Sequence, residues 1–122
     1  VAFPEYPWIH INHSEEGDTD CLGIFDSNVL KFNPKDSNFK IPHMGWNTLQ
    51  NVSDLIPEDI ENKYVYYVHS YYVPVNCNTV ATTNYLHQFS AAMHKDNFYS
   101  TQFHPEKSGD IGEIILKRFI EL

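Results

Sequence analysis

A histidine and a glutamate in the last fifth of the chain, His104 and Glu106, lie two residues apart with Pro105 between them. Pro105 fixes its own φ and disfavours the helical region for the residue before it, so this segment is expected to be extended. Residues i and i+2 of an extended segment project to the same side. The Glu106 carboxylate can then hold one tautomer of the His104 ring and stabilise its protonated form. Those are the tasks of the orienting acid and the general base in a nucleophilic triad.

A triad also needs a nucleophile, and no residue has the sequence context of one. Cys21 is followed by Leu-Gly, but Thr19 stands where a nucleophile elbow has glycine, and the negative charge of Asp20 disfavours a thiolate. Cys77 is expected in a loop, and Ser70 is expected to be a hydrogen-bonding residue at a strand end. The spacing of the two cysteines matches no redox or zinc motif, so two free thiols of a reduced intracellular protein are expected.

The composition indicates one globular domain with no nucleic acid or membrane as its partner. The chain has 122 residues, 42% of them hydrophobic and 15% aromatic, and a formal net charge of −8 that disfavours polyanions. No apolar run has the length of a transmembrane helix, and the first residues do not resemble a signal peptide. The seven histidines do not have the spacing of a metal motif, so they are expected to be structural or exposed, with no metal and no cofactor.

The elements that must position the His104 loop are predicted to be short strands. Alternation, β-branched residues and turn signals predict strands at 21–32 (two strands separated by a turn at 26–28), 39–41, 64–73, 79–86, 88–94 and 98–103. The nearly continuous aromatic and β-branched run at 64–73 predicts a strand covered on both faces. Residues 42–47 are expected to form a loop, and residues 51–63 one or two helical turns that are broken at Pro57.

A helix is predicted to end the chain. Asp110 and Glu113 give it a start that resembles a capping box. The apolar residues that share one face of this helix are Ile111, Ile114, Ile115, Phe119 and Ile120. The His104 and Glu106 pair then lies where a strand ends and the chain turns into a helix, and α/β folds hold ligands at such places.

Six stretches of the sequence carry a resemblance to a known family. They are SEEG (14–17), LGIFDSNVLKF (22–32), PHMGWN (42–47), YYVHSYYV (66–73), ATTNY (81–85) and QFHPEKSGDIG (102–112). Together they resemble the C-terminal part of class I (triad-type) glutamine amidotransferases. HPE is shared by the whole class, whereas PHMGWN together with HSYY and HPEKSG resembles the glutaminase subunits of imidazole glycerol phosphate synthase.

The resemblance implies a fold and a set of site residues. The fold is the later portion of a flavodoxin-like α/β domain over residues 14–122, with a mixed, mostly antiparallel sheet and a C-terminal helix, while residues 1–13 are unlike the family and unassigned. The implied site residues are His104 and Glu106 as the catalytic pair, Ser70 and Tyr71 at the glutamine site, and Trp46, Asn47 and Lys107 at the partner interface and ammonia gate.

The resemblance also implies an activity and a partner. The family hydrolyses L-glutamine through a cysteine thioester, giving glutamate and ammonia without a cofactor. The ammonia passes to the cyclase (synthase) subunit of a heterodimer, which uses it in L-histidine biosynthesis in the cytoplasm. The resemblance therefore implies a hydrolase activity on glutamine that is coupled to the lyase activity of the synthase.

Three departures from the family pattern qualify this expectation. No G-x-C-x-G elbow precedes SEEG, no glycine-rich oxyanion strand is present, and Leu86 replaces a family glycine. The isolated chain is therefore expected to be inactive and to be marginally stable or to associate through an exposed apolar sheet face. Two alternatives stay open: a truncated, non-catalytic remnant that binds the partner, and a paralogous amidotransferase that supplies ammonia to another synthase.

Overall fold

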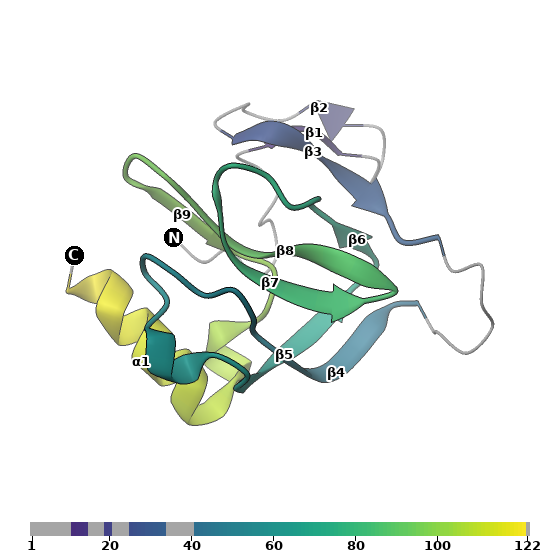
Figure 1. Cartoon of the computed structure of the whole chain (residues 1–122). Helices are drawn as coiled ribbons and strands as arrows, with labels where there is room; N and C mark the ends of the chain where they lie inside the picture. Colours follow the sequence, from purple (N-terminus) through teal and green to yellow (C-terminus); the bar gives the residue numbers. More distant parts are fainter. Residues whose placement is uncertain (1–10, 15–18, 21–24, 34–40, 122) are drawn as a thin grey trace.

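The computed structural model describes residues 11–14, 19–20, 25–33 and 41–121 of the chain, and three small sheets make up about half of these ranges (Figure 1). The strands are β1 (Ile11–Ser14), β2 (Thr19–Asp20), β3 (Phe25–Lys31), β4 (His43–Thr48), β5 (Tyr64–His69), β6 (Tyr71–Tyr72), β7 (Thr79–Tyr85), β8 (His87–Lys95) and β9 (Phe98–Thr101). The helical elements are the 3-10 turns η3 (Glu58–Ile60) and η4 (Pro105–Lys107) and the helix α1 (Gly109–Ile120).

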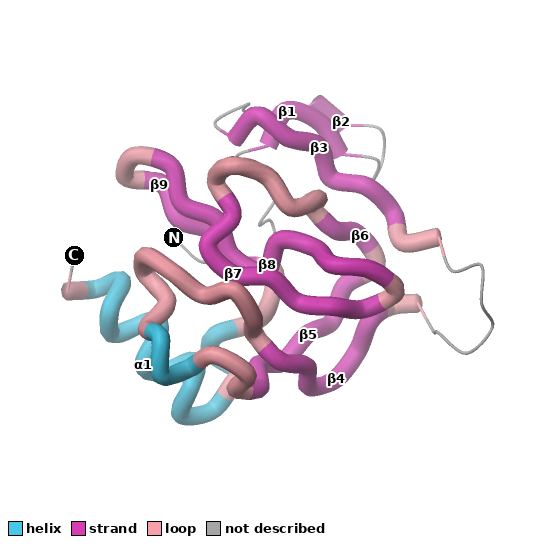
Figure 2. The backbone as a smooth tube through the Cα atoms, viewed as in Figure 1, coloured by secondary structure: helices cyan, strands magenta, loops and turns pink. Residues whose placement is uncertain are grey.

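The sheets have the strand orders β2-β1-β3-β6, β4-β5 and β7-β8-β9. Strands β1 and β3 are parallel, and the other described pairs are antiparallel. The helical segments gather on one side of the molecule, beside the end of the β4-β5 sheet (Figure 2). The expected mixed, mostly antiparallel architecture with one C-terminal helix is confirmed. No helix among the described residues is long and apolar enough to span a bilayer.

The strands near the C-terminal end lie close to the predicted ranges at 79–86, 88–94 and 98–103. Strands β7, β8 and β9 follow one another as antiparallel neighbours, and Lys95 pairs with Phe98 in the hairpin of β8 and β9. Leu86 alone connects β7 to β8 and has a φ of 68°. This left-handed conformation favours glycine, so the residue that departs from the family pattern occupies a position suited to the family's glycine.

The largest correction concerns residues 43–48, which form strand β4 rather than a loop. This strand pairs with β5 over its whole length, with His43 opposite His69 and Gly45 opposite Tyr67. Gly45 has a φ of 125°, a conformation that suits glycine inside the strand. The proline, glycine and tryptophan of this stretch suggested a loop. The strand was missed because it forms by pairing with β5, which lies some twenty residues further along the chain.

Two other strand predictions need correction. Residues 26–28 lie inside the continuous strand β3 and do not form a turn. Strand β5 is not covered on both faces, because its side chains alternate between buried and more exposed positions, and Tyr64 is 59% exposed. The predicted strand at 39–41 lies outside the described residues except for Ile41, which is in a bend.

Helix α1 begins at Gly109, whereas the predicted capping box began only at Asp110. Its N-cap is Ser108, and no side chain caps the first turn, so the pairing of Asp110 with Glu113 is wrong. Ile115 is buried and Ile111 packs against the core, whereas Ile114 and Ile120 are exposed, so the predicted apolar face is only partly used. The 3-10 turn η3 begins directly after Pro57, as the expected helical turn with a break at that proline requires.

One main core connects the β4-β5 sheet, the β7-β8-β9 sheet and the helix. Its buried members are Phe32, Leu49, Ile56, Ile60, Val65, Tyr67, Val80, Ala81, Phe89, Ala91, Ala92, Phe103 and Ile115. Phe103 immediately precedes His104 and is fully buried, so the core anchors the start of the His104 loop.

Candidate active site

His104 and Glu106 form the predicted pair. The Nδ1 atom of His104 lies 2.7 Å from the Glu106 Oε1 atom, with the histidine side chain 13% exposed and the glutamate 47% exposed. A carboxylate can only accept, so Nδ1 carries a proton. The Nε2 atom makes no hydrogen bond to any described residue. This geometry leaves Nε2 as the ring nitrogen that could exchange a proton with a substrate, as a general base must.

The backbone reaches this geometry in a way the sequence prediction did not foresee. His104 is extended, with φ −96° and ψ 98°, but Pro105, Glu106 and Lys107 form the 3-10 turn η4 instead of continuing the strand. The turn begins with proline, whose fixed φ suits the first helical position. The side chains of residues 104 and 106 meet because the chain curls and not because they alternate along a strand.

Strand β5 holds this loop in place through backbone and side-chain hydrogen bonds. The His104 N–H donates to the Tyr66 carbonyl at 3.0 Å, and the Tyr66 N–H donates to the Ser108 Oγ atom at 3.0 Å. The Ser108 hydroxyl in turn donates to the His104 carbonyl at 2.6 Å. Ser108 is 2% exposed, so these bonds are shielded from water. One serine therefore ties the loop to its supporting strand.

We expect Ser108→Ala to destabilise the chain by about 1–3 kcal/mol, because the Tyr66 N–H loses its partner in a buried position. Urea unfolding of the parent and the variant measures the change. Ser53→Ala is the matched control, since Ser53 is exposed and its hydroxyl makes only a long, 3.4 Å bond to the Val80 carbonyl. Equal losses in the two variants would contradict the tethering role of Ser108.

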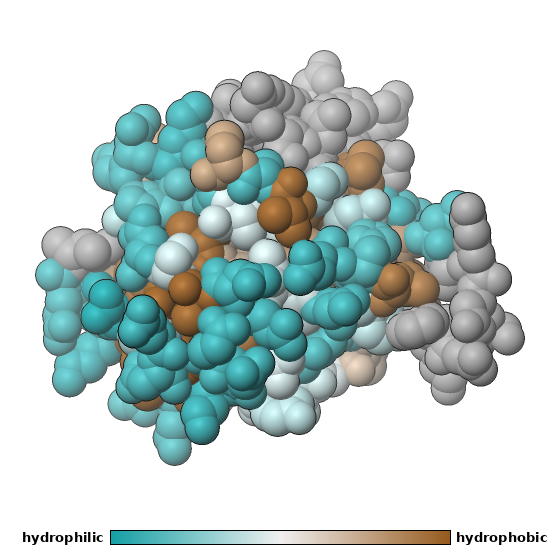
Figure 3. Space-filling model, in the orientation of Figure 1, coloured by the Kyte–Doolittle hydropathy of each residue, from teal (hydrophilic) through white to brown (hydrophobic). Residues whose placement is uncertain are grey.

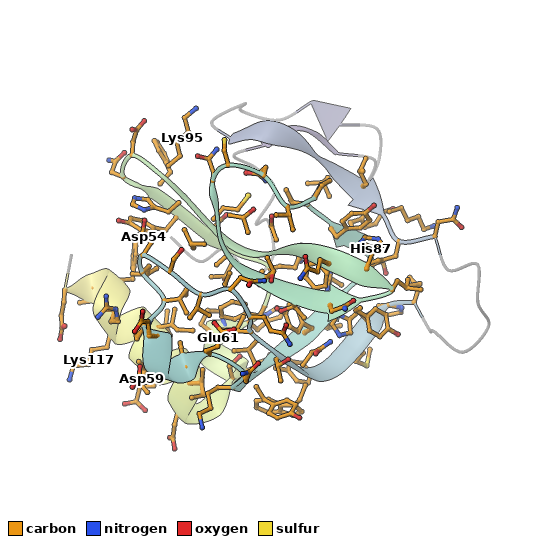
Figure 4. The ribbon with its side chains drawn as sticks, in the orientation of Figure 1. Asp54, Asp59, Glu61, His87, Lys95 and Lys117 are labelled. Carbon is orange, nitrogen blue, oxygen red and sulfur yellow. The ribbon has the colours of Figure 1, made fainter. Side chains whose placement is uncertain are left out.

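A second histidine–carboxylate pair has a different chemistry. His94 Nδ1 lies 2.5 Å from Asp54 Oδ2, and His94 Nε2 lies 2.6 Å from the Asp96 carbonyl. Asp54 lies on the side of the molecule that also carries Lys95, near the tip of the β8-β9 hairpin (Figure 4). Both ring nitrogens of His94 face acceptors within the protein, so neither is open toward a substrate. This pair joins a loop to a hairpin, and among the described histidines only His104 has Nδ1 on a carboxylate and no hydrogen-bond partner at Nε2.

Two buried histidines form a hydrogen-bonded pair in the β4-β5 sheet. His43 on β4 and His69 at the end of β5 join through Nδ1 and Nε2 at 2.9 Å, and both are less than 10% exposed. Burial lowers the pKa of His43 to about 4. Burial also lowers the pKa of His69 to about 3; the hydrogen bond to the Tyr71 carbonyl acts in the opposite direction, and the charges of His43 and His104 lower the pKa slightly further. Sequence reasoning missed this pair because it placed His43 in a loop.

The predicted glutamine-site residues lie where the chain leaves the β4-β5 sheet. Ser70 follows His69, and its carbonyl accepts the Phe32 N–H at 3.0 Å. Tyr71 opens strand β6, pairs with Lys31 of β3, and its carbonyl lies 2.7 Å from His69 Nδ1. Both residues are half-buried. The structure thus fixes the backbone of this segment on two sides.

The predicted partner residues do not share one face of strand β4. Trp46 is 55% exposed on the outer face and packs edge-on against Tyr66, with the ring centroids 5.8 Å apart. The Asn47 side chain donates to the Asn84 carbonyl at 3.0 Å, which connects β4 to β7. Lys107 is exposed at the end of η4.

The described residues supply no thiol next to His104. Cys77 is a free, exposed cysteine in the segment between β6 and β7, which lies on the side of the molecule away from η4 and α1 (Figure 1). Cys21 lies outside the described residues, so its role stays a prediction. No cluster of three or more potential metal ligands occurs in the described part of the chain.

An open groove of about 580 Å³ runs along α1 beside the site, with Glu106 on its rim. Glu113, Glu121 and Lys117 also line it, so its charge is mainly acidic and unsuited to the carboxylate of an amino acid. The surface over η3 and α1 is mostly hydrophilic, with small apolar patches (Figure 3). His104 does not line this groove.

Comparison with known proteins identifies the family of the chain. Residues 21–122 match the family model described as glutamine amidotransferase class-I. The chain is 59% identical over 110 residues to the imidazole glycerol phosphate synthase subunit HisH of Bacteroides fragilis, covering 89% of this chain and 56% of the relative. It is 56% identical over 111 residues to the Bacteroides thetaiotaomicron subunit, covering 90% and 57%. It is 46% identical over 110 residues to the Escherichia coli subunit, covering 88% and 55%.

The chain therefore spans little more than half the length of the curated relatives it matches. The family model nevertheless covers most of the chain and includes the His104 and Glu106 pair. The chain belongs to the class-I glutamine amidotransferase family.

Proposed function

We propose that this chain carries the base and orienting acid of a glutaminase site in an imidazole glycerol phosphate synthase. In this function, L-glutamine is hydrolysed to glutamate and ammonia, and the ammonia passes to the cyclase subunit for L-histidine biosynthesis in the cytoplasm. One observation carries the proposal: His104 donates its Nδ1 proton to Glu106 and leaves Nε2 free, in a chain of this family. Residues 14–122 form the proposed domain.

The chemistry assigned to the pair is a two-step proton transfer. His104 Nε2 takes the proton of a cysteine thiol as the sulfur attacks the side-chain amide carbon of glutamine, and returns it to the nitrogen that leaves as ammonia. Water then attacks the thioester and gives a proton to Nε2, which passes it to the departing sulfur. Glu106 stabilises the imidazolium in both steps. Ser70 and Tyr71 bind the amino-acid end of glutamine.

The test measures glutamate formation from L-glutamine by the chain mixed with a cyclase subunit of imidazole glycerol phosphate synthase. In a mixture in which the parent chain forms glutamate, we expect His104→Ala to lower turnover at least about a hundredfold, the usual contribution of a general base, and Glu106→Gln to lower it by a similar factor. His87→Ala is the control, because His87 is exposed at the turn between β7 and β8 (Figure 4). Turnover that survives His104→Ala would refute the assignment.

The same assay identifies the thiol and the acceptor of the ammonia. Loss of turnover in Cys21→Ala but not in Cys77→Ala would make Cys21 the nucleophile. Ammonia transfer to a different synthase, with none to the cyclase subunit, would favour the paralogous amidotransferase.

A second candidate function, binding of the partner without catalysis, is favoured by the outer face of the β4-β5 sheet. Its exposed apolar side chains are Met44, Trp46 and Tyr64, which are 63%, 55% and 59% exposed. Met44, Trp46 and Thr48 project to the same side because they alternate along β4. Tyr64 projects to that side too, because it lies directly opposite Thr48 on the neighbouring strand. A parent chain that binds the cyclase subunit but forms no glutamate would establish this function instead.

Both candidate functions assign Trp46 to the interface, with Asn47 and Lys107 near the path of ammonia. We expect Trp46→Ala to weaken binding of the cyclase subunit at least about tenfold, because buried tryptophans dominate interface energies. Isothermal titration calorimetry measures the dissociation constant. Val75→Ala is the control, since Val75 is also exposed but lies outside this face. Equal affinities of all three chains would place the interface elsewhere.

A further inference from the structure

The buried histidines His43 and His69 belong to a hydrogen-bond chain whose direction is fixed at both ends by backbone groups. At one end, the His69 Nδ1 atom lies 2.7 Å from the Tyr71 carbonyl. A carbonyl only accepts, so Nδ1 of His69 carries a proton. If the ring is neutral, its Nε2 atom is an acceptor, and the His43 Nδ1 atom at 2.9 Å must be the donor.

The other end gives the same direction independently. The Asn47 Oδ1 atom accepts the Thr48 N–H at 2.8 Å, and its Nδ2 atom donates to the Asn84 carbonyl at 3.0 Å. These two bonds fix the orientation of the amide, so Nδ2 faces His43 Nε2 as a donor, at a longer 3.4 Å. The Nε2 atom of His43 must then be an acceptor, and Nδ1 must carry the proton of a neutral ring.

Only one protonation state satisfies all of these contacts. A proton added to either imidazole would bring two donors face to face, at Asn47 or between the two rings. The surroundings also disfavour a charge. His43 is stacked between the rings of Tyr67 and Tyr85, and His69 packs against Phe32 and Phe89. The titratable groups that face the pair are Tyr67 of β5, Tyr85 of β7 and His104 of the loop, and no contact between described residues brings a carboxylate to either ring.

The chain of bonds ends on the segment to which the proposed function assigns glutamine binding. Tyr71 lies just beyond the point where the strand leaves the β4-β5 sheet and joins β3. The Ser70 carbonyl is held by Phe32 and the Tyr71 carbonyl by His69. The His69 bond links the first and last residues of the turn at 69–71, so its loss would leave that turn held only from the side of β3.

We infer that His43 and His69 are positioning residues: as a neutral pair of Nδ1–H tautomers, they hold the Tyr71 carbonyl and keep the segment from Ser70 to Tyr71 in the shape that binds glutamine. This inference rests on the proposed function for its ligand but not for its geometry. It also connects strand β4, which carries Trp46 on its outer face, to the glutamine segment through Asn47 on its inner face.

The first measurement reads the tautomers directly and does not depend on activity. Long-range ¹H–¹⁵N NMR spectra of the full chain at pH 7 distinguish the Nδ1–H tautomer, the Nε2–H tautomer and the imidazolium. We expect the signals that disappear in His43→Asn and His69→Asn to be those of neutral Nδ1–H rings. An Nε2–H tautomer or an imidazolium at either residue overturns the inference, and so does a set of seven histidines that all behave as in an unfolded chain.

The second measurement tests the effect on glutamine. We expect His43→Leu to weaken L-glutamine binding about tenfold, while His43→Asn, whose amide can still donate from the position of Nδ1, stays within about threefold of the parent. His87→Asn is the matched control: its ring packs against Phe32 and Tyr72 but takes no part in the chain of bonds. Equal losses in His43→Leu and His43→Asn would reduce the pair to a packing role and overturn the inference.

The two measurements separate the inference from the proposed function. A parent chain that binds no L-glutamine would refute the proposed function, and the positioning of a ligand with it. The tautomer spectra would still decide whether the directional pair exists. The expected tautomers, together with L-glutamine binding that is weakened in His43→Leu and kept in His43→Asn, support both the inference and the proposed function.

Discussion

Gly112→Ala is expected to destabilise the chain by about 3 kcal/mol, because a Cβ atom there has no room. It would lie 1.8 Å from the carbonyl oxygen of Pro105 and 2.9 Å from the Ser108 Cβ atom. Both neighbours belong to the loop that contains Glu106, and the Pro105 carbonyl is held by the Ser108 N–H at 3.1 Å. The helix must move away from η4, or the peptide between Pro105 and Glu106 must rotate. Either change draws Glu106 away from His104.

The sign of this effect is opposite to that of helix propensity, which makes the experiment decisive. In an unobstructed helix, alanine would stabilise the chain by about 1 kcal/mol relative to glycine. Urea unfolding at pH 7 measures the change. Glu113→Ala is the control, since Glu113 is exposed and lies one residue further along α1, and a change within about 0.5 kcal/mol is expected there. A Gly112→Ala chain as stable as the parent would show that the helix does not press on the loop.

Acid is expected to destabilise the fold from just below neutral pH. The pKa of a histidine in the unfolded chain is about 6.5, and burial lowers the pKa of His43 to about 4 and that of His69 to about 3. At pH values between these limits, the unfolded chain binds protons that the folded chain rejects. The free energy of unfolding therefore falls as the pH falls, by about 1.4 kcal/mol per pH unit for each histidine. The loss begins near pH 6.5 and continues to about pH 4 for His43 and about pH 3 for His69.

Urea unfolding between pH 7 and pH 5 measures this slope before most carboxylates take up protons. His43→Asn removes one of the two titrating groups, so we expect about half of the slope to disappear, and His87→Asn is expected to leave it unchanged. A parent chain equally stable at pH 7 and pH 5 would mean that neither imidazole is held neutral by the fold.

Local patterns in the sequence predicted much of the second half of the fold. Strands β7, β8 and β9 are joined by short turns, so their pairing follows from the order of the chain, and their ranges lie close to the predicted strands at 79–86, 88–94 and 98–103. Helix α1 was predicted from the spacing of its apolar residues, although two residues of the predicted apolar face, Ile114 and Ile120, are exposed. Hydrophobic periodicity and turn residues predict structure that depends on residues close together in the sequence.

Long-range pairing could not be predicted in the same way. Strand β4 contains Gly45 at a positive φ and owes its form to β5, with His43 and His69 separated by 26 residues. The contact between His104 and Glu106 was predicted because the residues are two apart, yet the 3-10 turn that joins them depends on bonds from His104 and Ser108 to Tyr66. The spacing in the sequence predicted that these two side chains meet, whereas tertiary contacts determine how they do so.

The bonds between the His104 loop and Tyr66 have a consequence for solubility. Among the described strands, β5 pairs with β4 alone, so its other side is a sheet edge. The loop occupies this edge, since Tyr66 gives its carbonyl to His104 and its N–H to Ser108. Open edges recruit strands from other molecules and start aggregation. The segment that contains His104 therefore also shields an aromatic strand, so a change that loosens the His104 loop is expected to expose this edge to other molecules.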